Sequence, residues 1–199
     1  NGFDKKIKIN NNKPIDINGL TGCVSLINLN LKNIKINSNN STCEDSINLI
    51  NVKGNLLDVK IINSLMDGLD IDFSDVSIDN IFISGSNNDC LDLSYGNYHL
   101  GNVKLYNCGD KGLSVGEKSI VYNDYIEVQN TDIGIASKDS SLTKLNTVNL
   151  KKTKTCVSAY KKKQEFNGGY LSVKNLNCID YYKKIDLDNF SEIKIQNEL

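Results

Sequence analysis

The sequence contains no Arg, and it has a single His, a single Pro and a single Met among its 199 residues. Its 23 basic residues are therefore all Lys, and they nearly balance 24 acidic residues. Because proteins that bind nucleic acid through its phosphates carry an excess of basic residues, nucleic acid is not an expected partner. The single His, His99, lies in a segment that we expect at the surface or in a turn, which argues against a nucleophilic triad.

Long apolar runs are also missing. No stretch approaches the roughly 18 apolar residues that a membrane span needs, so no span is expected. No signal peptide precedes Asn1, but a chain that does not begin with Met fits a processed protein or a piece of a longer one, so this says little about localisation. A chain of 199 residues can bury a sizeable core as one domain.

An internal repeat is the strongest signal in the sequence. A small residue, an apolar residue, any residue and a second apolar residue recur with a spacing of 22 residues, as the residue numbers show. The copies begin at Ser46, Gly68, Cys90, Gly112, Gly134, Cys156 and Cys178. A second apolar pair keeps almost the same spacing, at Val59/Ile61, Ile81/Ile83, Val103/Leu105, Ile126/Val128, Val148/Leu150, Leu171/Val173 and Ile193/Ile195.

Alternation of apolar and polar residues is typical of strands, and the Asn, Gly, Asp and Ser between the pairs form turns. Short strands stacked coil on coil bury a core that no single repeat could make. The repeat therefore predicts an all-β, single-stranded, right-handed parallel β-helix of about eight coils of ~22 residues. We expect one domain over residues 1–199, with an irregular N-terminal cap or first coils in 1–45 and regular coils in 46–199. Within the first part, residues 1–20 would cap the edge or continue from a preceding coil, and residues 37–45 would form a polar loop.

The same alternation predicts which side chains point outward from the first strand of each coil. One outward column contains Asp70, Asp92, Ser114, Ala136, Ser158 and Asp180. The next contains Asp72, Ser94, Gly116, Lys138, Tyr160 and Tyr182. Acidic residues dominate the early coils and Lys the later ones, so a sugar chain or an anionic polymer could lie along this face.

Asp70 and Asp92 should lie one strand spacing apart, flanked by other carboxylates, and like charges so placed repel. Such a cluster takes a cation, shares a proton or points into solvent, so solvated surface, a polar-ligand site and a Ca²⁺ site all stay open. No cofactor or metal is assigned. The candidate catalytic residues are Asp70, Asp92 and Lys111. The candidate substrate contacts are Asp67, Asp72, Asp89, Asp110, Glu117, Lys138, Asp139, Tyr160, Lys162 and Glu165. The charged run Lys161–Gly169 is either a solvated loop or a lip over the face.

Six Cys residues lack the CxxC pairs of a zinc site or a redox motif. We expect structural thiols, with disulfides and a metal site as the alternatives. Cys156 and Cys178 would be vertical neighbours on paired parallel strands, where side chains lie side by side, and we therefore expect both to be free.

Several segments resemble successive coils of pectate-lyase-like right-handed β-helices, most of all those that accompany bacterial CotH-type proteins. They are Asp67-Gly-Leu-Asp-Ile-Asp-Phe-Ser74, Asn88-Asp-Cys-Leu-Asp-Leu-Ser94, Gly109-Asp-Lys-Gly-Leu-Ser-Val-Gly-Glu-Lys-Ser119, Gly134-Ile-Ala-Ser-Lys-Asp-Ser-Ser141 and Ala159-Tyr-Lys-Lys-Lys-Gln-Glu-Phe-Asn-Gly-Gly169. The resemblance implies the β-helix fold and, for the wider superfamily, polysaccharide substrates. Pectate lyases use an Arg base, which this chain lacks, and polygalacturonases pair Asp residues with a His.

Three functions follow as hypotheses. The first is a carbohydrate-binding or surface-interaction β-helix, extracellular or at the cell surface, with a glycan as partner. The second is a polysaccharide-modifying enzyme of the hydrolase, lyase or uronan epimerase type. The third is a structural segment of a larger surface protein or oligomer. We favour binding without turnover.

Overall fold

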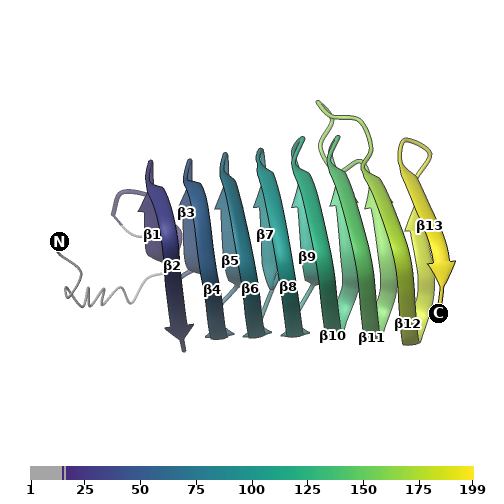
Figure 1. The fold of residues 1–199 in the computed structure, drawn as a ribbon, viewed down its shortest axis with the longest axis horizontal. Coiled ribbons are helices and arrows are strands. Elements are labelled where there is room, and N and C mark those ends of the chain that lie inside the picture. The colour runs from purple at the N-terminus through teal and green to yellow at the C-terminus, as the bar shows by residue number, and fades with distance from the viewer. Residues whose placement is uncertain (1–14, 16) are drawn as a thin grey trace.

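The structure is a computed structural model that describes residue 15 and residues 17–199. In this part of the chain every strand pair is parallel, and the strands wind into a β-solenoid of about eight turns with a spacing of about 22 residues. Figure 1 shows the turns stacked in sequence order along the long axis. The predicted all-β parallel solenoid is confirmed.

The strands form two rows. They are β1 (Gly22–Ile27), β2 (Asn30–Asn39), β3 (Asp45–Ile50), β4 (Lys53–Ser64), β5 (Asp67–Asp72), β6 (Asp75–Ser86), β7 (Leu91–Ser94), β8 (Asn97–Cys108), β9 (Lys111–Gly116), β10 (Ile120–Lys138), β11 (Leu142–Tyr160), β12 (Tyr170–Leu187) and β13 (Glu192–Glu198). The short strands β1, β3, β5, β7 and β9 pair in one row, and β2, β4, β6 and β8 pair in the other. β10 pairs with both β8 and β9, so it runs through both rows, and β11 and β12 continue it.

The core lies between the two rows. In the short-strand row, Leu69, Leu91, Leu113, Ile135 and Val157 occupy successive paired positions and are fully buried. Burying a side chain of this size contributes about 1.5–3 kcal/mol, so the stacked columns of the two rows supply the main folding energy.

The predicted register fails at one place. The column that starts at Gly68, Cys90, Gly112, Gly134 and Cys156 is confirmed, but Cys178 does not continue it. Val157 pairs with Ile185, 28 residues later, because the loop 161–169 lengthens this turn. Cys178 pairs instead with Leu150 in the long-strand row.

The outward columns change with this register. Asp186 takes the place beside Ser158 that was predicted for Asp180. Tyr182 likewise leaves its predicted column. In the long-strand row, Leu171 pairs with Thr143, so the predicted pair Leu171/Val173 lies earlier in its coil than expected.

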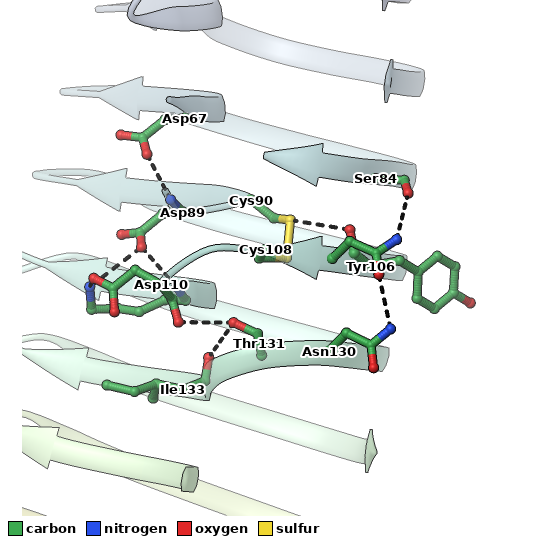
Figure 2. The surroundings of a disulfide bond; sticks show 12 residues. Asp67, Ser84, Asp89, Cys90, Tyr106, Cys108, Asp110, Asn130, Thr131 and Ile133 are labelled. Carbon is green, nitrogen blue, oxygen red and sulfur yellow. Dashed lines mark hydrogen bonds and ion pairs between the residues drawn. A yellow bond between two sulfur atoms is a disulfide. The ribbon is translucent and has the colours of Figure 1, made fainter. Parts of the chain in front are cut away.

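The expectation of free thiols is wrong. All six cysteines are paired, as Cys23–Cys43, Cys90–Cys108 and Cys156–Cys178. Because of the shifted register, Cys156 and Cys178 come from different strand rows and are not side by side in one column, and their Cα atoms are 6.3 Å apart. Figure 2 shows the Cys90–Cys108 bond.

The first coil is more regular than predicted. β1 pairs with β3 and β2 pairs with β4, with register shifts between Leu31 and Lys35. β2 continues to Asn39, so the polar loop predicted for 37–45 is shorter. The predicted cap over residues 1–20 lies mostly outside the described residues. In the described part of the chain, no helix is long and apolar enough to cross a membrane.

Candidate ligand-binding face

The candidate site is the outer face of the short-strand row over β3, β5, β7 and β9. Along these strands Asn48, Asp70, Asp92 and Ser114 occupy successive paired positions. Because their chain neighbours point into the core, these four side chains point outward. The structure thus places Asp70 beside Asp92, as the repeat predicts.

Asp70 lies at the centre of the acidic part of the face. The Asn48 side-chain amide donates a hydrogen bond to Asp70 Oδ2 at 2.7 Å. Burial and then the neighbouring carboxylates of Asp72, Asp45 and Asp92 raise the pKa of Asp70 to about 9. At neutral pH its carboxyl group therefore holds a proton and can donate a hydrogen bond.

Two of the candidate carboxylates also hold the turns between coils. Asp67 Oδ1 accepts a hydrogen bond from the Asp89 backbone N–H at 2.8 Å, and Asp89 Oδ1 accepts one from the Lys111 backbone N–H at 3.0 Å. Figure 2 shows these aspartates following one another along the stack. Burial raises the pKa of both Asp67 and Asp89 to about 6. Their contacts give them a role in fixing the coil register.

Asp45 and Asp72 complete the group of partly desolvated carboxyls. Burial raises the pKa of each to about 6, and neighbouring carboxylates add to the effect. Asp45 is buried, whereas Asp72 stays partly open to solvent next to Asp70. The acidic part of the face therefore changes its charge between mildly acidic and neutral pH.

Lys111 is enclosed by carboxylates. Its ammonium group lies 3.4 Å from Asp89 Oδ1 and also contacts Asp110. Burial would lower its pKa, but the attraction of Asp89 and the hydrogen bond to Asp110 outweigh burial and hold the pKa above its ordinary value. Lys111 therefore stays protonated, which favours an electrostatic role over that of a base.

Lys138 reaches Asp92 from two coils further along the stack, across the coil of β9. Its Nζ lies 3.8 Å from Asp92 Oδ1, within ion-pair distance but beyond a hydrogen bond. The side chain passes over Gly116, where an added Cβ would come within 3.0 Å of Lys138 Cε. Glycine at this position makes room for the Lys138 chain. Tyr160 pairs with Lys138 on the next coil, and burial raises the pKa of its hydroxyl.

The loop 161–169 folds back onto the later part of the face. Asp139 Oδ1 accepts hydrogen bonds from the backbone N–H groups of Lys162 and Lys163 at 2.7 and 2.8 Å. Lys163 Nζ lies 2.6 Å from Glu117 Oε1, while Ser94 Oγ donates to Glu117 Oε2 at 2.5 Å. The loop is therefore anchored as a lip, and Figure 1 shows it projecting between β11 and β12.

These contacts also set the ionisation of Glu117. Burial alone would raise its pKa, but the hydrogen bonds from Lys163 and Ser94 outweigh burial and lower it. The side chains of two other candidates, Lys162 and Glu165, are exposed on the loop.

Comparison of the chain with protein-family models, with curated proteins and with solved structures finds no match. The fold therefore stands on the structure, and the resemblance to pectate-lyase-like and CotH-associated segments remains a prediction.

The remaining predictions concern a metal and the histidine. Among residue 15 and residues 17–199, no group of three or more His, Cys, Asp and Glu residues is arranged to hold a metal ion, and this includes the carboxylates weighed for Ca²⁺. His99 lies on β8 in the long-strand row and stacks on Tyr122 with ring centroids 5.2 Å apart. Its predicted position off the face is confirmed.

Sequence reasoning missed two polar residues of the face. Asn48 occupies the outward position of the repeat copy Ser46-Ile-Asn-Leu, so extending the column by one coil would have found it. Lys163 was recognised only as part of a charged run, because its contact with Glu117 depends on how the loop folds.

Proposed function

We propose that this chain is a carbohydrate-binding β-helix and that its outer face over β3, β5, β7 and β9 binds a glycan. The observation that carries the proposal is a row of neighbouring polar side chains that stay open to solvent. Asp70 pairs with Asp92 and Asp72 pairs with Ser94 on β5 and β7, and all four side chains are partly exposed. Carboxyl and hydroxyl groups so placed can donate and accept hydrogen bonds, which favours a ligand rich in hydroxyl groups.

The charges on the face favour a neutral glycan over an anionic one. Lys111, Lys138 and Lys163 each have a carboxylate partner within ion-pair distance. The Lys charges at the basic end of the face, predicted from the sequence, are therefore largely neutralised by carboxylates. The carboxylates of the early coils would repel a polyanion, whereas the hydroxyls of a neutral sugar can donate to Asp92 and accept from protonated Asp70.

The disulfides support an extracellular or cell-surface location. Disulfides persist in oxidising compartments and are rare in the cytosol. All six cysteines of this chain are paired. The parallel solenoid also agrees with the proposed relationship to pectate-lyase-like proteins and CotH-associated β-helices, whose wider superfamily acts on polysaccharides.

Affinity electrophoresis against neutral glycans and uronans tests the proposal. We expect retardation by a neutral glycan, and Asp92→Asn should weaken it about tenfold or more, because the variant removes a charged hydrogen-bond acceptor. Asp79→Asn, an exposed substitution on β6 in the other row, is the matched control and should bind like the wild type. Absence of binding to every glycan, or equal binding by the Asp92 variant, would contradict the proposal.

Hydrolysis of the glycan is the second candidate, and the pairing of Asp92 with Asp70, whose pKa burial raises to about 9, favours it. Asp70 and Asp92 occupy paired positions, so their backbones lie about 4.8 Å apart, a spacing that can bring two carboxyl groups near the roughly 5 Å of retaining glycosidases. Asp70 would act as the acid. Reducing-end and unsaturated-product assays on the same glycans decide the question: turnover that Asp70→Asn abolishes would establish catalysis, and retention without product would support binding alone.

A further inference from the structure

One corner of the solenoid carries aromatic residues in an unusual backbone conformation. The residue that follows each short strand of the early coils has a positive φ, in the order Asn28, Asn51, Phe73 and Tyr95. The backbone N–H of each donates to the next coil: Asn51 N to Asp72 O, Phe73 N to Ser94 O and Tyr95 N to Glu117 O. The four residues therefore occupy equivalent positions.

Asparagine tolerates this left-handed conformation, and the first two coils use it. Asn51 Nδ2 donates to Asn28 Oδ1 at 2.7 Å, which forms a side-chain ladder. Phe73 and Tyr95 both have φ of 51°, and bulky residues are genuine outliers there. Strain of this kind persists where the surrounding structure imposes it and clusters at ligand sites.

The two rings are arranged as a platform that stays open to solvent. Phe73 and Tyr95 stack with centroids 4.7 Å apart and planes 9° apart. Phe73 is 57% exposed and Tyr95 is 40% exposed. Phe166, from the lip, packs edge-on against Tyr95 at 6.1 Å and is itself only 8% exposed. The lip thus contacts Tyr95, and the exposed part of the platform lies mainly on Phe73.

The platform continues directly from the polar face. Phe73 follows Asp72 and Tyr95 follows Ser94, so outward polar side chains of β5 and β7 lie beside each ring. Glu117 accepts a hydrogen bond from the Ser94 hydroxyl and forms an ion pair with Lys163. An apolar ring surface bordered by hydroxyl and carboxylate groups matches a sugar ring, which presents C–H groups on its faces and hydroxyls around its edge.

We propose that the exposed part of the Phe73–Tyr95 pair forms an aromatic subsite against which one sugar ring of the glycan held on the outer face packs its C–H groups. This inference rests on the proposed function, since it assigns one ring of that same glycan to the corner of the solenoid. The lip contributes Phe166 as a support for Tyr95 and not as a direct contact.

The subsite is tested by replacing each aromatic residue with asparagine, the residue at the equivalent position of the first two coils. Phe73→Asn and Tyr95→Asn are compared with the wild type for binding to cellohexaose, mannohexaose and polygalacturonate by isothermal titration calorimetry. We expect each variant to bind the preferred neutral hexaose about fivefold to tenfold more weakly, because one stacking contact is lost. Tyr182→Asn, which replaces an exposed tyrosine on β12, should leave the affinity unchanged.

Thermal unfolding separates binding from folding in these variants. Phe73→Asn should not lower the midpoint, since asparagine adopts the left-handed conformation with less strain. If Asp92→Asn loses the hexaose while both corner variants keep it, the subsite is overturned and the proposed function stands. If the wild type binds none of the three probes, the proposed function fails, and the subsite fails with it.

Discussion

At the level of single residues, Asp70 dominates the protonation of the outer face. Its pKa is about 9 in the folded protein, against 3.8 for the same group in free solution. Between these values the folded chain binds a proton that the unfolded chain releases. The stability that this proton contributes is fully present below about pH 4 and is lost as the pH rises through about 9. Asp45, Asp67, Asp72 and Asp89 act in the same direction over a narrower range, up to about pH 6.

We therefore predict that Asp70→Asn flattens the pH dependence of stability. The wild type should unfold at a lower temperature at pH 8.5 than at pH 6.5, because Asp70 loses its proton only in the unfolded chain over most of this range. The variant keeps an acceptor for the Asn48 amide and has no ionisable group there. Its midpoint should change less between the two pH values, as calorimetry can measure, and Asp79→Asn should retain the wild-type slope. A variant with the full wild-type slope would show that Asp70 is not the group responsible.

Some of these residues could be placed from the sequence and some could not. The pairing of Asp70 with Asp92 follows from a repeat of 22 residues, because vertical neighbours in a solenoid are one period apart. The partners of Lys111 and Lys138 do not follow from the period. Lys138 reaches Asp92 across the intervening coil, and this depends on the space above Gly116.

At the level of strands, the two faces of β5 and β7 have separate roles. Leu69, Ile71, Leu91 and Leu93 fill the core, and the residues between them form the polar face. Since core residues carry the folding energy and outward carboxylates mainly repel one another, substitutions on the two faces should have different effects.

Accordingly, Leu91→Ala should lower the free energy of unfolding by roughly 2–5 kcal/mol, since it leaves a cavity in a close-packed column. The double variant Asp70→Asn/Asp92→Asn should leave the stability at neutral pH nearly unchanged or raise it, because it removes the cost of keeping a proton on Asp70. Urea unfolding followed by circular dichroism measures both. Unfolding of the double variant under native conditions would mean that these carboxylates hold the structure together and do not serve a ligand.

The register error in β12 shows where a repeat misleads. Cys178-Ile-Asp-Tyr matches the start pattern and lies 22 residues after Cys156. The lip adds six residues to the turn, the difference between the observed spacing of 28 and the usual 22, so this segment falls in the other row. Each coil carries two apolar patterns with nearly the same period, so a segment of one strand row can fall at the spacing expected for the other row. Only the pairing of the strands distinguishes the two rows. The same shift brings Cys156 and Cys178 within bonding distance.

At the scale of the whole molecule, each coil contacts mainly its two neighbours, so stability is distributed along the stack. Within the described residues, β13 pairs with β12 only from Tyr170 to Leu176, and the rest of β12 has one paired edge. Tyr182 and Leu187 on that part are exposed. The three disulfides lie in the first coil, near the middle and in the last coils.

The Cys156–Cys178 bond should therefore act locally, on the coils with an open edge. It closes a loop with a sequence separation of 22 residues, and a bond of this span typically contributes about 3 kcal/mol. In Cys156→Ser/Cys178→Ser we expect amide hydrogen exchange to accelerate in β12 and β13 while β5 to β8 keep their protection, because coils far along a solenoid are coupled only through the coils between them. The matched variant Cys90→Ser/Cys108→Ser should instead loosen the middle coils. Uniform loss of protection along the chain in the first variant would show that the stack unfolds as a single cooperative unit.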